Sequence, residues 1–140
     1  MRYWDTSAVI PLLIAESSSA RMRNTLAADP AVVTWWATQI ECVSTFARLG
    51  REGRLSPGAT VATIARLRAA AAMWTELGPS SDLREQAFRL VRVHQLRASD
   101  AIQLAAAIIA SDFQPGALEF VTLDSRQAEA AEKEGFRTIA

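Results

Sequence analysis

The sequence predicts an α/β protein with a small, mainly parallel sheet of four or five strands flanked by about seven helices. Short apolar runs rich in β-branched and aromatic residues alternate with longer segments of helical periodicity. This alternation is typical of parallel strands joined by crossover helices. The chain has 140 residues, of which 50% are hydrophobic, so we expect one domain with a real core over residues 1–140.

Five short apolar segments are expected to form the strands. Residues 31–35, AVVTW, are apolar at almost every position, which is typical of a strand buried on both faces of a parallel sheet. Residues 73–78 have no clear period, and we assign them to a short strand ended by Gly78-Pro79. The expected strands are 2–5, 31–35, 73–78, 118–123 and 136–139.

Seven segments carry helical periodicity or helix-start signals. Pro11 fits the first of them only in its initial turn, because proline removes a backbone N–H from the helix interior. Pro57 stands at a first helical position, and Asp82 and Glu85 have the spacing of a capping box. Gly135 follows the last helix. The expected helices are 7–15, 20–28, 38–51, 56–72, 82–96, 99–109 and 125–134.

The composition excludes several classes of protein. Fifteen basic and fifteen acidic residues give no net charge, which argues neither for nor against a nucleic-acid partner. Cys42 is the only cysteine, so an internal disulfide and a cysteine-based metal site are excluded, and a cytoplasmic location is expected. The apolar N-terminus imitates a signal peptide, but Asp5 and Pro11 argue against one. No apolar run is long enough to cross a membrane.

Four acidic residues stand where strands should end or helices begin: Asp5, Glu41, Asp100 and Asp124. Each has an ordinary structural interpretation. Asp5 and Asp124 could be helix N-caps, and Asp100 could favour the positive end of its helix. Glu41 shares a polar stripe with Thr38, Thr45 and Arg48, so it could lie on plain surface.

The four carboxylates gain a second interpretation from the expected fold. Side chains at the carboxyl ends of parallel strands reach one edge of the sheet, and the following helices begin there. If all four converged and ionised, their mutual repulsion would cost on the order of 15–20 kcal/mol at an effective dielectric constant near 20. A cation would relieve this repulsion. Oxygen ligands without histidine or cysteine favour a hard ion, Mg²⁺ or Mn²⁺.

The same positions carry a family resemblance. In chain order they lie in the segments 3–8 (YWDTSA), 39–41 (QIE), 96–105 (LRASDAIQLA) and 120–124 (FVTLD). Their order and spacing resemble the four motifs of PIN-domain proteins over the whole chain. The similarity is greatest to the VapC toxins of bacterial toxin–antitoxin modules.

The resemblance implies a PIN-like α/β/α sandwich and an endoribonuclease that hydrolyses RNA phosphodiesters with water activated by Mg²⁺ or Mn²⁺. Asp5, Glu41, Asp100 and Asp124 would be its catalytic, metal-holding acids, and the hydroxyls of Ser7 and Thr122 would support them. Nothing is inferred from Gln103. The resemblance also implies an antitoxin partner and a homodimer or a toxin–antitoxin hetero-oligomer.

Two other functions remain open from the residues alone. A PIN-like fold could act as a protein-binding module without catalysis, although the presence of all four acids argues against this. A phosphatase of the haloacid dehalogenase type also begins with an aspartate after its first strand. That chemistry needs a second aspartate two residues later, where this chain has Ser7, and a well-placed lysine, whereas Lys133 is its only lysine.

Two further features suggest partners. Arg48, Arg51 and Arg54 recur every three residues and could bind RNA phosphates, or could be a solvated helix face. The first two helices are more apolar than a small sheet requires, so they could form a groove for a partner helix. The apolar residues that suggest this groove are Ile10, Leu13, Ile14, Met22 and Leu26.

Overall fold

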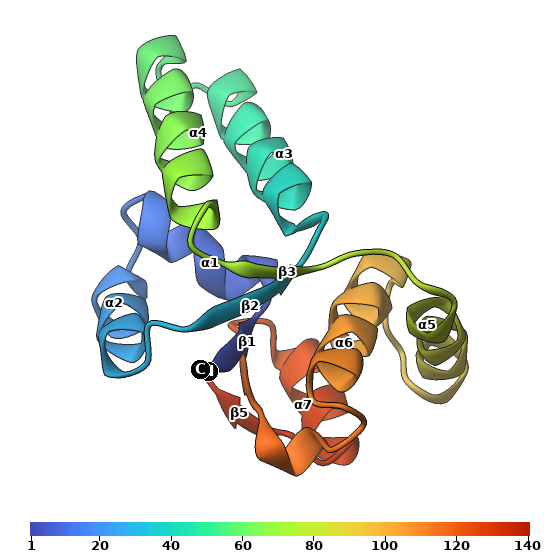
Figure 1. Cartoon of the computed structure of the whole chain (residues 1–140). Coiled ribbons are helices and arrows are strands. Elements are labelled where there is room, and N and C mark those ends of the chain that lie inside the picture. The colour runs from blue at the N-terminus through green and yellow to red at the C-terminus, as the bar shows by residue number, and fades with distance from the viewer.

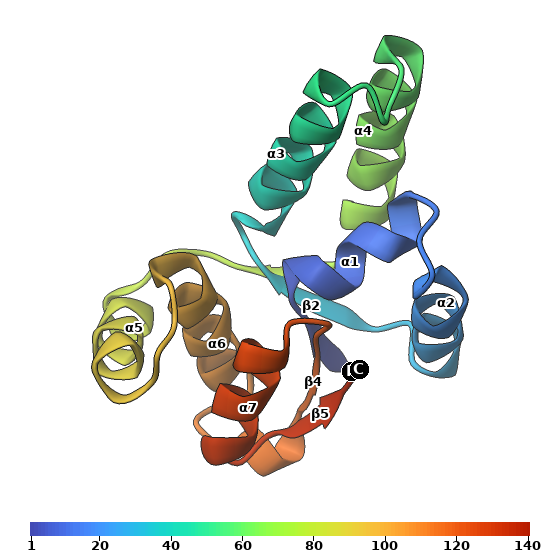
Figure 2. The same ribbon diagram turned by 180° about the vertical axis from the view of Figure 1, so that it is seen from behind.

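The computed structural model describes residues 1–140 and contains one five-stranded sheet (Figures 1 and 2). The spatial order is β3-β2-β1-β4-β5, and every neighbouring pair is parallel, with Tyr3 opposite Val33 on one side and Phe120 on the other. The predicted fold class is therefore confirmed. The strands are β1 Arg2–Trp4, β2 Val32–Trp35, β3 Thr75–Leu77, β4 Glu119–Val121 and β5 Arg137–Ile139.

Seven α-helices and one short 3₁₀ turn surround the sheet. The helices are α1 Thr6–Leu13, α2 Ser19–Ala28, α3 Thr38–Arg51, α4 Pro57–Ala71, α5 Ser81–Val93, α6 Ala98–Ala110 and α7 Ser125–Lys133, and the turn η1 covers Pro115–Ala117. Helices α3 and α4 pair with each other and project away from the sheet as an arm, whereas α5, α6 and α7 gather on the opposite side (Figure 1).

The two faces of the sheet bury two separate apolar clusters. Successive side chains of a strand point to opposite faces, so neighbours on β1 enter different cores. Tyr3 packs with Phe120 and with α5, α6 and α7, and its ring stacks on Phe120 at a centroid distance of 5.3 Å. Trp4 packs with Val121 and with α1, α2, α3 and α4. Burial on both faces explains why β2, Val32–Trp35, is buried at every position and has no alternating polar pattern.

The element boundaries differ from the sequence predictions in a few places. The strand expected over 2–5 ends at Trp4 because Asp5 turns to cap α1, and the strand expected over 118–123 is shortened to Glu119–Val121. The helix expected to reach residue 96 ends at Val93, where His94 is extended and its ring contacts Glu134 at 2.7 Å.

Two local predictions about helix starts were wrong. Pro11 lies in the second turn of α1 rather than the first. It removes one hydrogen bond from a helix that ends two residues later, so little of the ladder is lost. Ser80, not Asp82, caps α5, because its hydroxyl accepts the N–H of Leu83 at 3.1 Å. The segment 73–78, which had no clear period, does contain a strand, β3.

The apolar groove expected on the first two helices is not present as predicted. Ile10, Leu13 and Met22 are buried, and Ile14 and Leu26 pack against the same cluster. The arm explains the difference, because α4 packs against α1 and covers apolar surface that the sheet alone would have left open. None of the helices is both long enough and apolar enough to span a bilayer.

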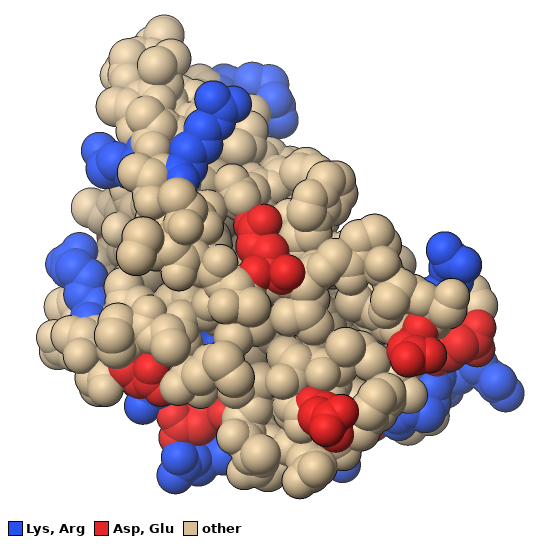
Figure 3. Space-filling view, in the orientation of Figure 1, with Lys and Arg blue, Asp and Glu red and all other residues tan.

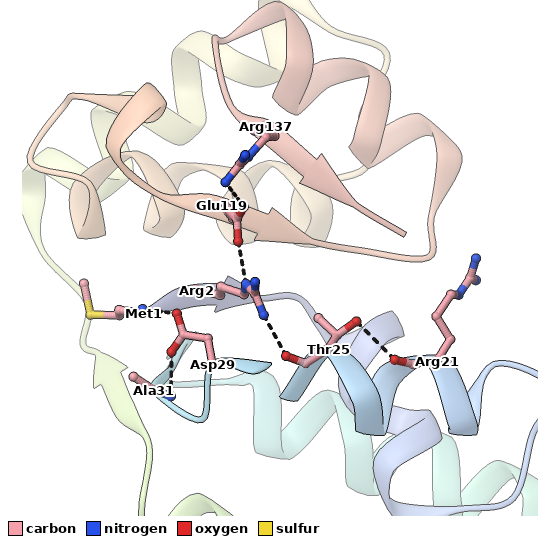
Figure 4. A network of polar contacts seen from close by, with 8 residues as sticks. All are labelled: Met1, Arg2, Arg21, Thr25, Asp29, Ala31, Glu119 and Arg137. Carbon is pink, nitrogen blue, oxygen red and sulfur yellow. Dashed lines mark hydrogen bonds and ion pairs between the residues drawn. The ribbon is translucent and has the colours of Figure 1, made fainter. Parts of the chain in front are cut away.

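Charged residues tie the amino-terminal edge of the sheet together (Figure 4). Arg2 on β1 donates from Nε to Glu119 of β4 at 2.5 Å and from Nη1 to the carbonyl of Thr25 on α2 at 2.7 Å. Arg137 of β5 donates to the second oxygen of the same Glu119 carboxylate. One glutamate therefore joins β1, β4 and β5, at the edge opposite the strand ends that carry Asp5.

We expect Glu119→Gln to lower the free energy of unfolding by about 1–2 kcal/mol, because two arginines would then face a neutral amide. Urea unfolding followed by tryptophan fluorescence measures the change. Glu129→Gln is the matched control, since Glu129 pairs only with Lys133 on the exposed side of α7. It should leave the unfolding midpoint close to that of the wild type. Equal midpoints for both variants would contradict this role of Glu119.

Candidate active site

Asp5 lies at the carboxyl end of the central strand β1 and is 1% exposed. Its backbone N–H donates to the carbonyl of Val121, which fixes the strand end against β4. Its side chain is the N-cap of α1, where Oδ1 accepts the hydroxyl of Ser7 at 2.7 Å and the N–H of Ala8 at 3.2 Å. All these contacts are neutral, so no cationic side chain balances the buried carboxylate.

The pKa of Asp5 is raised to about 7, mainly by burial and to a smaller extent by the nearby carboxylate of Asp124. The hydrogen bonds from Ser7 and Ala8 oppose this rise in pKa but do not cancel it. The ionised form of Asp5 is therefore destabilised, because its carboxylate is buried away from water and has no charged partner.

Glu41 reaches the same region from the first turn of α3 and is half-buried. Its Oε2 accepts the hydroxyl of Thr6 and, at 3.0 Å, the side-chain amide of Gln103. The polar stripe on α3 is therefore not plain surface at this position. Asp5 and Glu41 also raise the pKa of Tyr3, for which burial is the larger cause.

Asp100 and Asp124 lie at two helix starts that share one glutamine. Asp124 caps α7, and its Oδ1 accepts the backbone N–H groups of Arg126 at 2.8 Å and Gln127 at 3.2 Å. Asp100, in the first turn of α6, accepts the N–H of Arg97 at 3.4 Å and the side-chain amide of Gln127 at 3.5 Å. Gln127 therefore bridges the two acids, which lie far apart in the sequence.

Ser7 and Thr122 connect the first and fourth motifs. The Ser7 hydroxyl donates to Asp5, lies 3.3 Å from the hydroxyl of Thr122, and accepts the N–H of Leu123 at 2.8 Å. Thr122 in turn accepts the N–H of Asp124 at 3.1 Å. The two hydroxyls thus fix the backbone that carries Asp5 and Asp124.

The structure brings the four acids to one edge of the sheet, but as neighbours rather than as a closed cage. No three of its histidine, cysteine, aspartate and glutamate side chains lie close enough together to hold a metal ion. Cys42 is not a candidate ligand, since burial, with Glu41 and Asp5 nearby, raises the pKa of its thiol to about 12.

The donor chemistry of this edge nevertheless suits a hard divalent cation. Asp5 is a buried carboxylate with no cationic partner, and the other candidates are oxygen donors. The side-chain oxygen of Gln127 is also buried without a hydrogen-bond partner, in the same amide that contacts Asp100. Uncompensated buried oxygens favour a cation that prefers oxygen ligands, which is the behaviour of Mg²⁺ and Mn²⁺.

The sequence of this chain matches the model of a known protein family. The family model of the PIN domain matches residues 2–133, nearly the whole chain. The chain belongs to the PIN-domain family. Comparison with curated protein sequences gives no match.

Solved structures confirm the PIN fold of this chain. A toxin–antitoxin complex from Klebsiella pneumoniae matches with a TM-score of 0.63 and 21% identity, covering 91% of this chain and 90% of the other. VapC20 of Mycobacterium tuberculosis, described as a toxin that cleaves the sarcin–ricin loop, matches with a TM-score of 0.68 and 22% identity. That match covers 97% of this chain and 96% of VapC20. The predicted resemblance to PIN-domain and VapC proteins is confirmed.

The arginines proposed for RNA lie away from the carboxylates of this PIN domain. Arg48 and Arg54 both pair with Glu52, at 3.2 and 3.7 Å, which neutralises part of their charge. Arg51 is exposed at the end of α3, about 15 Å along the helix from Glu41. On the face shown in Figure 3, lysines and arginines are distributed around the rim and do not form a single patch.

Three polar residues of this site were not predicted from the sequence to belong to it: Tyr3, Thr6 and Gln103. Gln103 and Tyr3 are buried, and Thr6 donates to Glu41. Gln103 could have been noticed as the one polar side chain in the apolar run from Ala101 to Ile109. No local pattern indicates that its amide meets β1, because the hydrogen bond from Tyr3 joins residues 100 positions apart.

The raised pKa of Asp5 makes the stability of the metal-free PIN domain depend on pH. The folded state holds a proton up to about pH 7, whereas the unfolded chain loses it near 3.8. Stability is therefore highest below the unfolded pKa, falls as pH rises between the two values, and stays low above the folded pKa.

Asp5→Asn cannot ionise and keeps an oxygen for Ser7 and Ala8. In EDTA at about pH 8 we expect it to raise the free energy of unfolding by about 2–4 kcal/mol, with no difference near pH 4. Urea unfolding at several pH values measures this. Asp82→Asn, exposed on α5, is the control and should follow the wild-type profile. A variant no more stable than wild type at high pH would show that burial does not strain Asp5.

Proposed function

We propose that this PIN-domain protein is a metal-dependent endoribonuclease that acts in the cytoplasm as the toxin of a toxin–antitoxin module. The observation that carries the proposal is Asp5, buried at the end of the central strand with no cationic partner. Glu41, Asp100 and Asp124 begin or cap helices at the same edge of the sheet. The family match over residues 2–133 supports an enzyme built on these acids.

The proposed roles follow from the contacts of each residue. Asp5, Glu41, Asp100 and Asp124 would hold one or two Mg²⁺ or Mn²⁺ ions. A bound ion of this kind lowers the pKa of water and offsets negative charge at a phosphodiester. Ser7 orients the Asp5 carboxylate, and Thr122 orients the backbone before Asp124. Hydrolysis would leave a 5′-phosphate and a 3′-hydroxyl, and its chemistry does not require the ribose 2′-hydroxyl.

Two apolar hollows support the proposed protein partners. One, of about 370 Å³, lies between α5 and α6 and includes Trp35, Phe88 and Val91. The other, of about 330 Å³, lies between α3 and α4 beside Ile40 and Ile64. Two such surfaces would suit an antitoxin and a second copy of the chain, in a homodimer or a hetero-oligomer. One of the similar structures is itself a toxin–antitoxin complex.

The two rival functions receive less support. A non-catalytic binding module has no need to bury an unpaired carboxylate at Asp5, which strains the fold. A phosphatase of the haloacid dehalogenase type would need an acid at position 7, but Ser7 orients Asp5 there. Lys133 pairs with Glu129 on the outer side of α7 and does not serve the acidic edge.

Purified protein is expected to cut RNA in Mg²⁺ or Mn²⁺ and to stop in EDTA. Asp5→Asn and Asp100→Asn should each lower the rate by about 100-fold or more, because each removes charge from the reacting centre. Denaturing gels of a labelled RNA measure the rate. Asp82→Asn serves as the control and should cut at the wild-type rate.

The outcomes separate the three functions. Cleavage that persists in EDTA would overturn the metal-dependent mechanism. Hydrolysis of a simple phosphate monoester, with RNA left intact, would support the phosphatase instead. An inert protein that still binds a partner would support the binding module. Asp5→Asn is expected to be more stable than wild type, so its loss of activity could not be attributed to unfolding.

Arg51→Ala tests the proposed RNA contact on α3. We expect weaker RNA binding, a slope of log affinity against log salt that is smaller by about 1, and an unchanged turnover at saturating RNA. Fluorescence anisotropy at several salt concentrations measures the slope. Arg23→Ala on the exposed side of α2 is the matched control. An unchanged slope for Arg51→Ala would place RNA away from the arm.

A further inference from the structure

Gln103 is a buried polar residue in the middle of the apolar helix α6. It is 1% exposed, and its neighbours Ala101, Leu104 and Ala105 belong to the core between α6 and the sheet. An amide in such surroundings must meet its hydrogen-bonding needs inside the protein. All of its partners lie on β1, α1 and α3 rather than on its own helix.

The amide of Gln103 has one satisfying orientation. Its Oε1 accepts the hydroxyl of Tyr3 at 2.7 Å. Its Nε2 lies 3.0 Å from the hydroxyl of Thr6, 3.1 Å from that of Thr38 and 3.0 Å from Oε2 of Glu41. A flipped amide would place its oxygen against the Glu41 carboxylate, where neither atom could donate. The acceptor-only carboxylate of Glu41 therefore selects the side of the amide that faces it, and the hydroxyl of Tyr3 donates to the amide oxygen on the other side.

The same contacts restrict the Glu41 carboxylate. Gln103 and Thr6 both donate to Oε2, and no protein donor is within hydrogen-bond distance of Oε1. Thr6 accepts from Gln103 while it donates to Glu41, so the three groups form a closed triangle. A carboxylate held by two donors on one oxygen keeps the lone pairs of its other oxygen for a cation.

We propose that Gln103 is a positioning residue, anchored by Tyr3, that orients Glu41 and thereby sets the affinity of the acidic edge for a divalent cation. The inference rests on the proposed function, because it assumes that the edge binds Mg²⁺ or Mn²⁺. Gln103 and Tyr3 would then form a second layer of residues that positions the acids. Second-layer hydrogen bonds of this kind commonly change metal affinity by about 10–100-fold.

Gln103→Met tests the proposal, since methionine has a similar volume and provides none of the hydrogen bonds. We expect the Mn²⁺ dissociation constant, measured by calorimetry on folded protein, to rise about 10–100-fold. Tyr3→Phe removes the hydroxyl that donates to Gln103 but keeps the amide, so it should weaken Mn²⁺ binding less than Gln103→Met does. It should have no added effect in the Gln103→Met background, because both changes act on one chain of contacts.

Ser111→Ala is the matched control for lost stability. Ser111 is also a buried polar residue associated with α6, and its hydroxyl donates only to the carbonyl of Ile108. It should leave Mn²⁺ affinity unchanged. Single-turnover RNA cleavage gives a further measure. The rate deficit of Gln103→Met should be large at low Mn²⁺ and should disappear as Mn²⁺ saturates, which loss of folding would not produce.

A spectroscopic measurement reports the anchor directly. Tyr3 is the only tyrosine, so isotope labelling of tyrosine Cζ gives one resonance for the hydroxyl that donates to Gln103. Adding Mn²⁺ should broaden this resonance in the wild type, because the ion binds close to the network. The resonance of the metal-free protein should shift in Gln103→Met and stay in place in Ser111→Ala.

The possible failures are distinguishable. If the wild type bound no Mn²⁺, the proposed function would fail, and this inference with it. If the wild type bound Mn²⁺ and Gln103→Met bound it equally well, only the inference would be overturned. Gln103 would then be a core residue that stabilises β1 against α6. Additive effects of Tyr3→Phe and Gln103→Met would also overturn the coupling through Tyr3.

Discussion

Much of the organisation of this protein depends on one buried carboxylate at the end of the central strand. Asp5 follows β1, which has two strands on each side, so its side chain is enclosed by elements from both halves of the sequence. Ser7 binds the carboxylate, and Thr122 and Leu123 fix Ser7. The elevated pKa of Asp5 shows that these neutral contacts do not fully replace water. A cation bound at this edge would offset the free-energy cost of burying the Asp5 carboxylate.

The fold and the positions of the acids could be predicted from the sequence because their signals are local. Apolar runs such as AVVTW predicted β2, and the structure has the predicted helix near Ser125 with Asp124 as its N-cap. Asp5 and Asp124 were placed at strand ends by the same local patterns. The expectation that helices starting at one edge would gather Glu41 and Asp100 there follows from parallel topology, and the contacts with Thr6 and Gln127 are consistent with it.

What could not be predicted depends on contacts between distant parts of the chain. In the sequence Tyr3 looks like an ordinary core residue and Gln103 like an isolated polar residue, and their hydrogen bond joins residues 100 positions apart. The apolar surfaces of α1 and α2 were interpreted as a groove because sequence does not show that α4 packs on α1. The spacing of the four carboxylates could not be predicted from the sequence either. The repulsion expected from the sequence assumed a closed nest of four carboxylates. In the structure the acids are neighbours at one edge, with Gln127 between Asp100 and Asp124 and with Gln103 hydrogen-bonded to Glu41.

The capping interpretation and the catalytic interpretation of the acids need not exclude each other, because a carboxylate has two oxygens. Asp5 uses Oδ1 for both Ser7 and the α1 N-terminus, so these two donors leave its Oδ2 free. Asp124 uses Oδ1 for the first turn of α7, and its Oδ2 has only Arg126, at 3.9 Å. Glu41 receives both of its hydrogen bonds on Oε2. In each case the fold orients the group through one oxygen and leaves the other available. Helix capping and side-chain hydrogen bonds thus hold repelling acids in fixed positions at this sheet edge before any cation binds.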